Sequence, residues 1–406
     1  MPFYKVYLNS AEINCKPNNV LLSRLFLYLR NNNHAIVSNL DDADYIIIST
    51  CGFDEFHEKR SLKLFKSHKN KYNAKIISLG CLNKINRELI SQISPEILII
   101  PKLSELDKIF YNNLKFNDIT EAYINENINK HLKITEEYQK DQKKIFFMDW
   151  QWLRKRSKLY NDINNELCRQ NKFYVEICKG CIGNCSYCII KKARGKIESR
   201  QIPHIISDID KVYNPGQHLC FVADDCGSYG VDTKSSFPIL VKEVHNRYPY
   251  LGIDICYLNP YWLVNHEKEY LALFRNHNIT SINISVQSGS NSVIKKMDRH
   301  YDINKVKNTI NKIRKISPKT FIWTHILVGF PGETWSDYFK TLAMVHRFDM
   351  ATVFSYSDRK GTKSAGFQNK NSKLAVFMKK QFARTLVRLN VLAKITGELF
   401  SRNSKH

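Results

Sequence analysis

Short apolar runs alternate with longer amphipathic stretches over the first hundred residues. Runs rich in β-branched residues begin at Phe3, Ala43, Ala74 and Glu96. The intervening stretches, such as FHEKRSLKLFKSHKN, carry apolar residues at helical spacing. This alternation predicts an open parallel α/β sheet, Rossmann-like in its strand–helix rhythm. In such sheets ligands bind at the carboxyl ends of the strands.

A second alternating series begins at Lys172. Six strand-like runs follow in order: KFYVEI, HLCFVA, GIDICYL, SINISV, TFIWTHILV and ATVFSYS. Six β/α units predict an incomplete (β/α)6 barrel rather than an eight-fold one. We therefore expect four parts: an N-terminal α/β domain over 1–102, a helical connector over 103–170 with one packed apolar turn at IFFMDWQWL, a barrel over 171–365, and a basic amphipathic helix over 366–406.

Composition narrows the class of protein. Apolar residues make up 43% of the 406, enough for a real core. Lys and Arg outnumber Asp and Glu by 62 to 38, and the net charge of +24 favours a polyanionic partner such as nucleic acid. A Lys- and Asn-rich background explains the same charge equally well. We expect no membrane segment, because there is no apolar signal core and no long apolar run. The eleven cysteines argue against a disulfide framework. The predicted compartment is the cytoplasm.

Six cysteines form two sets of three. One set is compact: Cys181, Cys185 and Cys188 share a loop after the first barrel strand. Three thiolates can hold three irons of a [4Fe-4S] cluster and leave the fourth iron open. Zinc is the alternative, with Cys178 as fourth ligand, but this spacing in one loop suits a tetrahedral ion poorly.

The other set is dispersed along the N-terminal half. Cys51 and Cys81 directly follow predicted strands, and Cys15 lies in the loop after the first strand. Parallel strands end at one edge of the sheet, so we expect the three thiols to converge there. The sequence thus predicts two half-open iron–sulfur sites.

Several blocks carry a family resemblance. CIGNCSYC resembles the signature of the radical S-adenosylmethionine (SAM) superfamily, and residues 1 to about 365 resemble its methylthiotransferases. The matching blocks include ISTCGF, SLGCLNK, DDCGSYGVD, VQSGSNSVIKKMDR and ILVGFPGETWSDY. The resemblance implies two [4Fe-4S] clusters, SAM as cofactor, and an external electron donor such as flavodoxin or ferredoxin. The barrel cluster would cleave SAM to a radical that abstracts hydrogen from an unactivated C–H bond. The other cluster would supply the sulfur, and a second SAM would methylate it.

Further site residues are expected at the barrel mouth. By resemblance, the SAM-contacting candidates are Tyr187, Asp225, Gln287, and the three turn residues Gly329, Pro331 and Gly332. A plain strand-to-helix turn explains the last three equally well. Asp224 and Ser288 are weaker candidates beside them. Arg194 is a candidate for binding an anion of the substrate or of SAM.

The chain departs from the family after residue 365. Typical members end in a small β-barrel TRAM module that grips the substrate, whereas FMKKQFARTLVRLNVLAKI predicts helix. The family's targets are adenosines beside the tRNA anticodon and an aspartate of a ribosomal protein. We expect tRNA adenosine as substrate, with a ribosomal protein, peptide or small molecule as rivals. A non-catalytic iron–sulfur protein that binds nucleic acid is the alternative from a different class.

Overall fold

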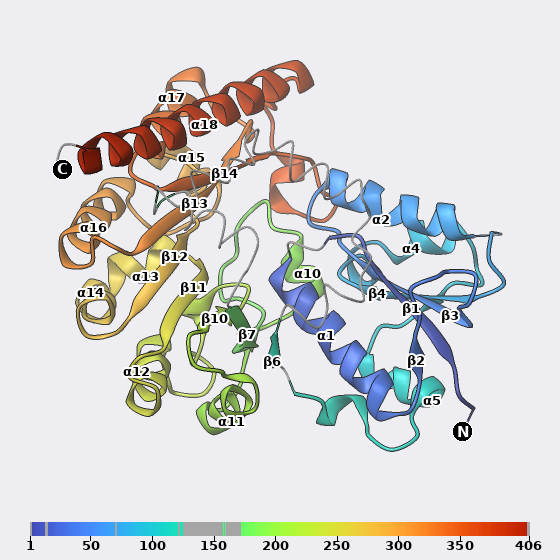
Figure 1. Ribbon diagram of the computed structural model, residues 1–406. Helices are drawn as coiled ribbons and strands as arrows, with labels where there is room; N and C mark the ends of the chain where they lie inside the picture. The colour runs from blue at the N-terminus through green and yellow to red at the C-terminus, as the bar shows by residue number, and fades with distance from the viewer. Residues whose placement is uncertain are drawn as a thin grey trace.

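The computed structural model describes residues 2–12, 15–69, 71–120, 122–124, 157, 159 and 172–403. Two α/β layers, each built on a sheet of mostly parallel strands, lie side by side, with helix α1 between them (Figure 1). No helix in these ranges is both long and apolar enough to cross a membrane.

The first sheet is parallel throughout, in the order β2-β1-β3-β4-β5. Its strands are β1 (Lys5–Ser10), β2 (Ala35–Ile36), β3 (Tyr45–Thr50), β4 (Lys75–Gly80) and β5 (Leu98–Ile99). The four expected runs are all present, although only two residues of EILIIP pair as β5. Strand β2 was not expected, because two residues are too short to show a period. The helices of this layer are α1 (Lys16–Asn31), α2 (Glu55–His68), α3 (Leu82–Ile85) and α4 (Arg87–Ser91).

Residues 103–120 form short helical turns that pack against α1. The Tyr28 hydroxyl donates to Asp107 Oδ1 at 2.8 Å, and Arg24 donates to the Phe116 carbonyl at 3.3 Å. The elements here are η1 (Leu103–Leu106), α5 (Asp107–Phe110), η2 (Phe116–Asp118) and β6 (Ala122–Ile124). The apolar turn expected at 145–153, like Cys168, lies outside the described residues.

The second sheet has the order β14-β13-β12-β11-β10-β7-β6. Its parallel strands are the six expected ones: β7 (Lys172–Glu176), β10 (His218–Val222), β11 (Gly252–Leu258), β12 (Ile279–Ile284), β13 (Phe321–Val328) and β14 (Met350–Ser355). Strand β6 adds an antiparallel edge on β7. The expected six-stranded incomplete barrel is confirmed.

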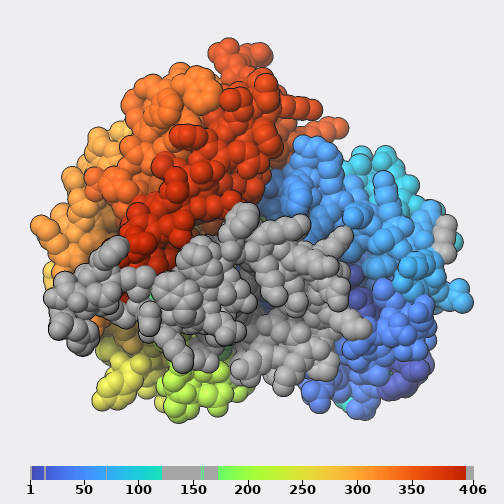
Figure 2. All heavy atoms as spheres, turned by 45° about the horizontal axis from the view of Figure 1, so that its top comes forward, coloured from blue at the N-terminus to red at the C-terminus, as the bar shows by residue number. Residues whose placement is uncertain are grey.

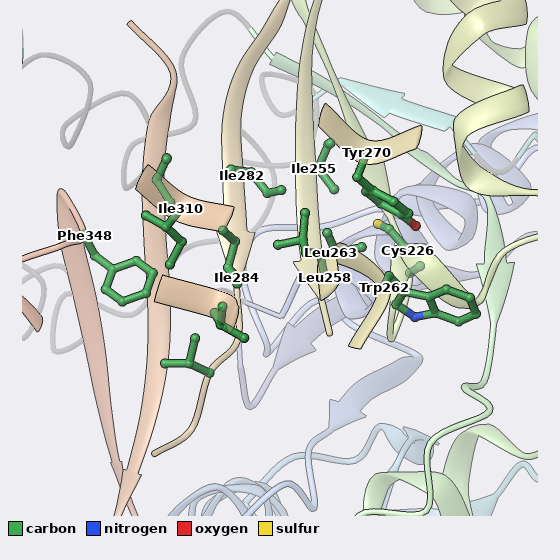
Figure 3. Packing of buried hydrophobic residues seen from close by; sticks show 14 of the residues in the cluster. Cys226, Ile255, Leu258, Trp262, Leu263, Tyr270, Ile282, Ile284, Ile310 and Phe348 are labelled. Atoms are coloured by element: carbon green, nitrogen blue, oxygen red, sulfur yellow. The ribbon is translucent and has the colours of Figure 1, made fainter. Parts of the chain in front are cut away.

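Helices on the outer face of this sheet enclose its main core. Buried side chains such as Ile255, Ile282 and Ile310 interdigitate between strands and helices (Figure 3). Side-chain caps start several of these helices; Asp302, for example, accepts from two backbone N–H groups of α16. The helices are α11 (Ile202–Val212), α12 (Phe237–Arg247), α13 (Pro260–Asn265), α14 (Glu267–Asn276), α15 (Asn291–Lys296), α16 (Ile303–Ile316) and α17 (Trp335–Val345).

Helix α18 (Lys373–Asn403) is the basic C-terminal helix expected from the sequence. It lies along β14 and α17, and buries Ala383, Val387, Val391 and Ile395. In Figure 2 the red end of the chain covers one side of the barrel and adjoins the blue N-terminal layer.

The inner face of the barrel is covered by the first layer. Val20 and Leu25 of α1 share a core cluster with Cys220, Val222 and Cys256 of β10 and β11. This packing brings the carboxyl edges of the two sheets together, and that edge-to-edge arrangement positions both sets of cysteines.

Candidate functional site

The compact cysteine set lies in a tightly turned loop at the barrel mouth. A two-stranded ribbon, β8 (Cys178–Lys179) and β9 (Glu198–Ser199), supports its base. Gly180 has φ +79° there, and a Cβ atom would meet the Lys196 carbonyl oxygen at 2.2 Å, so only glycine fits. A Cβ on Gly183 would lie 3.2 Å from Cys181 Sγ and 3.9 Å from Cys185 Sγ. Both thiols therefore surround one small residue.

The protein surroundings raise the pKa of two of these thiols, Cys181 and Cys188. Burial raises the pKa of Cys181 to about 12, and the Asp225 carboxylate adds to the rise. Desolvation of its sulfur raises the pKa of Cys188 to about 11, although the residue as a whole is exposed, and Cys185 contributes further. Such thiols become thiolates once they bind a cation, because the cation's charge inverts this balance.

The dispersed set meets at the carboxyl edge of the first sheet. Cys15 precedes α1, Cys51 follows β3, and Cys81 follows β4. Burial raises the pKa of Cys15 to about 12, and Cys81 is the next contributor. Burial likewise raises the pKa of Cys51, helped by Cys15 and Cys81. Cys81 thus acts electrostatically on both Cys15 and Cys51, although 30 or more residues separate consecutive members of the set.

Neither set has the geometry of a single-ion site. In the described ranges, no group of three or more His, Cys, Asp or Glu side chains has the arrangement that holds one metal ion. A four-iron cluster does not require such convergence, because each thiolate binds a different iron. The donor chemistry, three thiols per site, fits such clusters better than zinc.

Arg194 in α10 (Ile190–Arg194) lies between the two sets. Its guanidinium donates to Glu176 Oε1 at 2.5 Å and to Asp224 Oδ2 at 2.8 Å. Asp224 Oδ2 also accepts the Gly180 backbone N–H at 2.8 Å, which fixes the start of the compact loop. On the other side, burial raises the pKa of Cys81 and the charge of Arg194 opposes that rise. Arg194 and Asp224 therefore pair with each other, and Asp224 also fixes the loop.

Comparison with known proteins finds a matching family for each of the two layers. The radical SAM superfamily model matches residues 175–345, and that of the uncharacterized protein family UPF0004 matches residues 6–101. A tRNA-2-methylthio-N(6)-dimethylallyladenosine synthase of Clostridium botulinum is 30% identical over 89% of this chain and 79% of its own length. The chain belongs to the radical SAM methylthiotransferase family.

Other relatives agree with this assignment. The ribosomal protein uS12 methylthiotransferase RimO of Thermoanaerobacter sp. is 29% identical over 87% of this chain and 76% of its own length. Among solved structures, the radical SAM methyltransferase TsrM from Kitasatospora setae has a TM-score of 0.58 at 11% identity, covering 90% of this chain and 77% of TsrM. At that identity TsrM shows the fold alone. The methylthiotransferase is thus a SAM-dependent transferase that uses two [4Fe-4S] clusters.

Asp225 is the most connected of the expected SAM-contacting residues. It is buried beside Cys181 and accepts from the Trp262 indole and the Ser228 hydroxyl, each at 2.8 Å, and from the Asn259 N–H at 2.9 Å. Burial raises its pKa, and these donors oppose the rise. The carboxylate is held rigidly by its neighbours.

Tyr187 and Gln287 are also held in place at the mouth. The Tyr187 hydroxyl accepts from Arg299 Nη1 at 2.9 Å. Gln287 has φ +63°, unusual for a residue with a side chain, and its backbone exchanges hydrogen bonds with His325 and Leu327 of β13. Strain of this kind persists only where the surroundings impose it.

The glycines of VGFPGET have a packing role that the sequence did not reveal. A Cβ on Gly329 would lie 2.6 Å from Val376 of α18, and one on Gly332 would lie 2.7 Å from Lys296 Nζ. The Gly329 N–H donates to Glu333 Oε2 at 2.8 Å. Glu333 precedes α17 and pairs with Lys379 in the interior. Pro331 lies in the same turn. Gly329 therefore lets α18 approach the strand end, and Gly332 leaves room for the Lys296 side chain.

Several polar groups of the mouth were missed by sequence analysis. Arg299 joins Tyr187 to the Ser285 carbonyl. His325, in the middle of β13, has its pKa lowered to about 3 by burial, with Lys16 and Arg299 adding to the effect, and so remains neutral. Each looks like an ordinary strand or loop residue in the sequence, and no local spacing marks it.

The remaining thiols behave as core residues. Cys220 and Cys256 are buried, with their sulfurs 2.9 Å apart. Cys178 and Cys226 are buried too.

Proposed function

We propose that Cys181, Cys185 and Cys188 hold the cluster that binds SAM, and that Cys15, Cys51 and Cys81 hold the second cluster. The observation that best supports this proposal is the position of Arg194. It contacts Asp224 at the base of one set and acts electrostatically on Cys81 of the other. A substrate between the two sheet edges would therefore meet both sites, as insertion of sulfur at a carbon requires.

The bound clusters and SAM supply the radical and sulfur chemistry. The residues of the chain bind and orient these groups. Asp225, Tyr187 and Gln287 offer polar groups at the mouth, and the turn from Gly329 through Pro331 to Gly332 offers backbone for SAM. The chain divides on this proposal into a sulfur-donor layer at 1–102, a connector at 103–170, the radical SAM core at 171–365 and a terminal helix at 366–406. A small redox protein such as flavodoxin or ferredoxin would supply electrons.

We further propose tRNA adenosine as the substrate, supported by the net charge of +24 and by the tRNA-modifying relative. A protein or peptide is the second candidate. It is favoured by the relatives named for ribosomal protein uS12 and by the apolar outer side of α18, where Leu374, Phe377 and Phe382 are 68%, 58% and 57% exposed.

Mass spectrometry can separate these substrates. Total tRNA and ribosomal proteins are compared from cells with the gene, without it, and complemented with a Cys185→Ala variant. Loss of a methylthio group from a tRNA adenosine, in both the deletion and the variant strain, supports the proposal. The same loss on a protein would select the second candidate, and no loss on either class would contradict both.

A further inference from the structure

Three titratable side chains join the loops that carry Cys15 and Cys51. His57 Nε2 lies 3.0 Å from Glu12 Oε2, and His57 Nδ1 lies 2.5 Å from Asp54 Oδ1. The backbone N–H of His57 donates to the same Asp54 oxygen at 2.9 Å, so Asp54 also caps α2. The imidazole is thus held from both sides.

The two carboxylates that hold His57 each lie close in sequence to a cysteine of the dispersed set. Glu12 lies three residues before Cys15, and Asp54 lies three residues after Cys51. His57 therefore connects two segments that are separate in sequence and that each lead to a cluster cysteine. Its ring also makes edge contacts with Phe53 and Phe56.

A second tether lies one helical turn further along α2. The Ser61 hydroxyl accepts from the Cys51 N–H at 2.9 Å and lies within hydrogen-bond distance of the carbonyls of Cys51 and His57. Residues spaced by four share one face of a helix. One face of α2 therefore holds the backbone of Cys51 through Ser61 and the loop before Cys15 through His57.

The Glu12 end is also anchored. Asn18, in the first turn of α1, donates to the Glu12 carbonyl at 3.3 Å and accepts from the Ser49 hydroxyl of β3 at 2.5 Å. The loop before Cys15 is thus connected to both α2 and the sheet.

We propose that His57 is a positioning residue, which spaces the Cys15 loop against Cys51 so that the N-terminal cysteines can hold their cluster. This inference rests on the ligand set assigned under the proposed function. His57 itself ligates nothing; it acts through Glu12 and Asp54.

The charge on His57 should make this positioning pH-dependent. Burial lowers its pKa, but the bonds to Asp54 and Glu12 outweigh burial and raise the pKa to about 9. Burial raises the pKa of Asp54, and His57 and the more distant Lys380 of α18 lower it below its usual value. Because the folded pKa exceeds the usual 6.5, the contribution is complete below about pH 6.5 and is lost as pH rises through about 9.

The test isolates the N-terminal cluster. In a Cys181→Ala, Cys185→Ala, Cys188→Ala background, all bound iron belongs to the dispersed set. Anaerobic iron loss to a ferrous chelator is timed across a pH series. At pH 7, His57→Gln should lose iron about ten-fold faster than the background, as expected for one charge-assisted contact. The background itself should accelerate as pH rises through about 9, whereas His57→Gln should lack that step.

Two further variants keep the test decisive. His57→Arg retains a permanent charge with donors for both carboxylates, so it should restore slow loss and abolish the pH step. His300→Gln, an exposed histidine beside Asp298, is the matched control and should behave like the background. NMR titration of His57 in cluster-free protein should give a pKa near 9, lowered in Glu12→Gln.

The possible outcomes distinguish failure of the ligand set from failure of the positioning role of His57. A background that binds no iron would contradict the ligand set, and with it this inference. A background that binds iron, but whose rate and pH profile are unchanged in His57→Gln, would overturn the positioning role alone. A His57 pKa close to 6.5 would overturn it as well.

Discussion

The ammonium of Lys16 lies 2.8 Å from the thiol of Cys256, although 240 residues separate them. Lys16 directly follows Cys15, and Cys256 lies on the inner face of the barrel. The Lys16 ammonium also lies 5.4 Å from the centre of the Trp323 ring. The segment that carries Cys15 is therefore anchored inside the radical SAM core. This contact makes the relative position of the two sites part of the fold.

Replacing Lys16 should weaken that anchor. We expect Lys16→Met to lower the free energy of unfolding by about 1–3 kcal/mol, because a buried charged hydrogen bond is lost. Lys66→Met, on the exposed side of α2, is the control and should change stability by less than about 0.5 kcal/mol. Chemical denaturation of the cluster-free proteins measures both, and equal stability of the two variants would argue against the anchor.

Iron content tests the two cysteine sets. Anaerobically reconstituted enzyme should hold about eight irons per chain, as two four-iron clusters. The triple alanine variant of either set should hold about half that amount. A value near four for the unaltered enzyme would show that one set binds no cluster.

The two sets should also separate by function. Without Cys181, Cys185 and Cys188, reductive cleavage of SAM should stop. Without the dispersed set, 5′-deoxyadenosine should still form when SAM and a strong reductant are supplied, but no methylthio product should appear. Chromatography of the nucleoside and mass spectrometry of the substrate measure the two steps. Methylthiolation by the second variant would remove the sulfur-donor role from the dispersed set.

The pair formed by Glu333 and Lys379 supports the turn near Gly329. Both side chains are almost fully buried, 2.9 Å apart. Lys379→Ala should destabilise the fold by about 3–5 kcal/mol, because it leaves a carboxylate buried without its partner. The double change Glu333→Gln with Lys379→Met should recover most of that loss. The exposed Lys340→Ala is the control. A loss below about 1 kcal/mol for Lys379→Ala would mean that the carboxylate is not charged in the fold.

Binding of tRNA should depend on the outward-facing arginines of α18. Two basic residues of α18 are engaged within the fold, because Lys379 is paired with Glu333 and Lys394 donates to the Phe348 carbonyl. If tRNA binds here, alanine at Arg384 and Arg388 should reduce the salt dependence by about two phosphate contacts. Filter binding of unmodified tRNA across a salt series measures this slope. Salt-insensitive binding by the unaltered enzyme would contradict a tRNA substrate.

Local sequence patterns were sufficient for the fold, whereas the assignment of six cysteines as cluster ligands stays a prediction. The six barrel strands follow from runs of apolar, β-branched residues bounded by turn residues, because a strand's period is encoded in its own few residues. The compact cysteine set follows from spacing within one loop. Cys15, Cys51 and Cys81 could be grouped only through the rule that parallel strands end at one edge.

Tertiary structure alone decided which polar residues serve one another. Arg194 was a candidate for binding an external anion, and the structure pairs its guanidinium with Glu176 and Asp224. Arg359, after the last barrel strand, reaches Gly52 and Glu58 some 300 residues earlier. Such partners are set by how two sheets pack edge to edge, and packing between distant segments leaves no period or spacing in the local sequence. The sequence determined which chemical groups this protein carries. The packing of the two layers determined which charged residues pair with one another and how the two cysteine sets lie relative to each other.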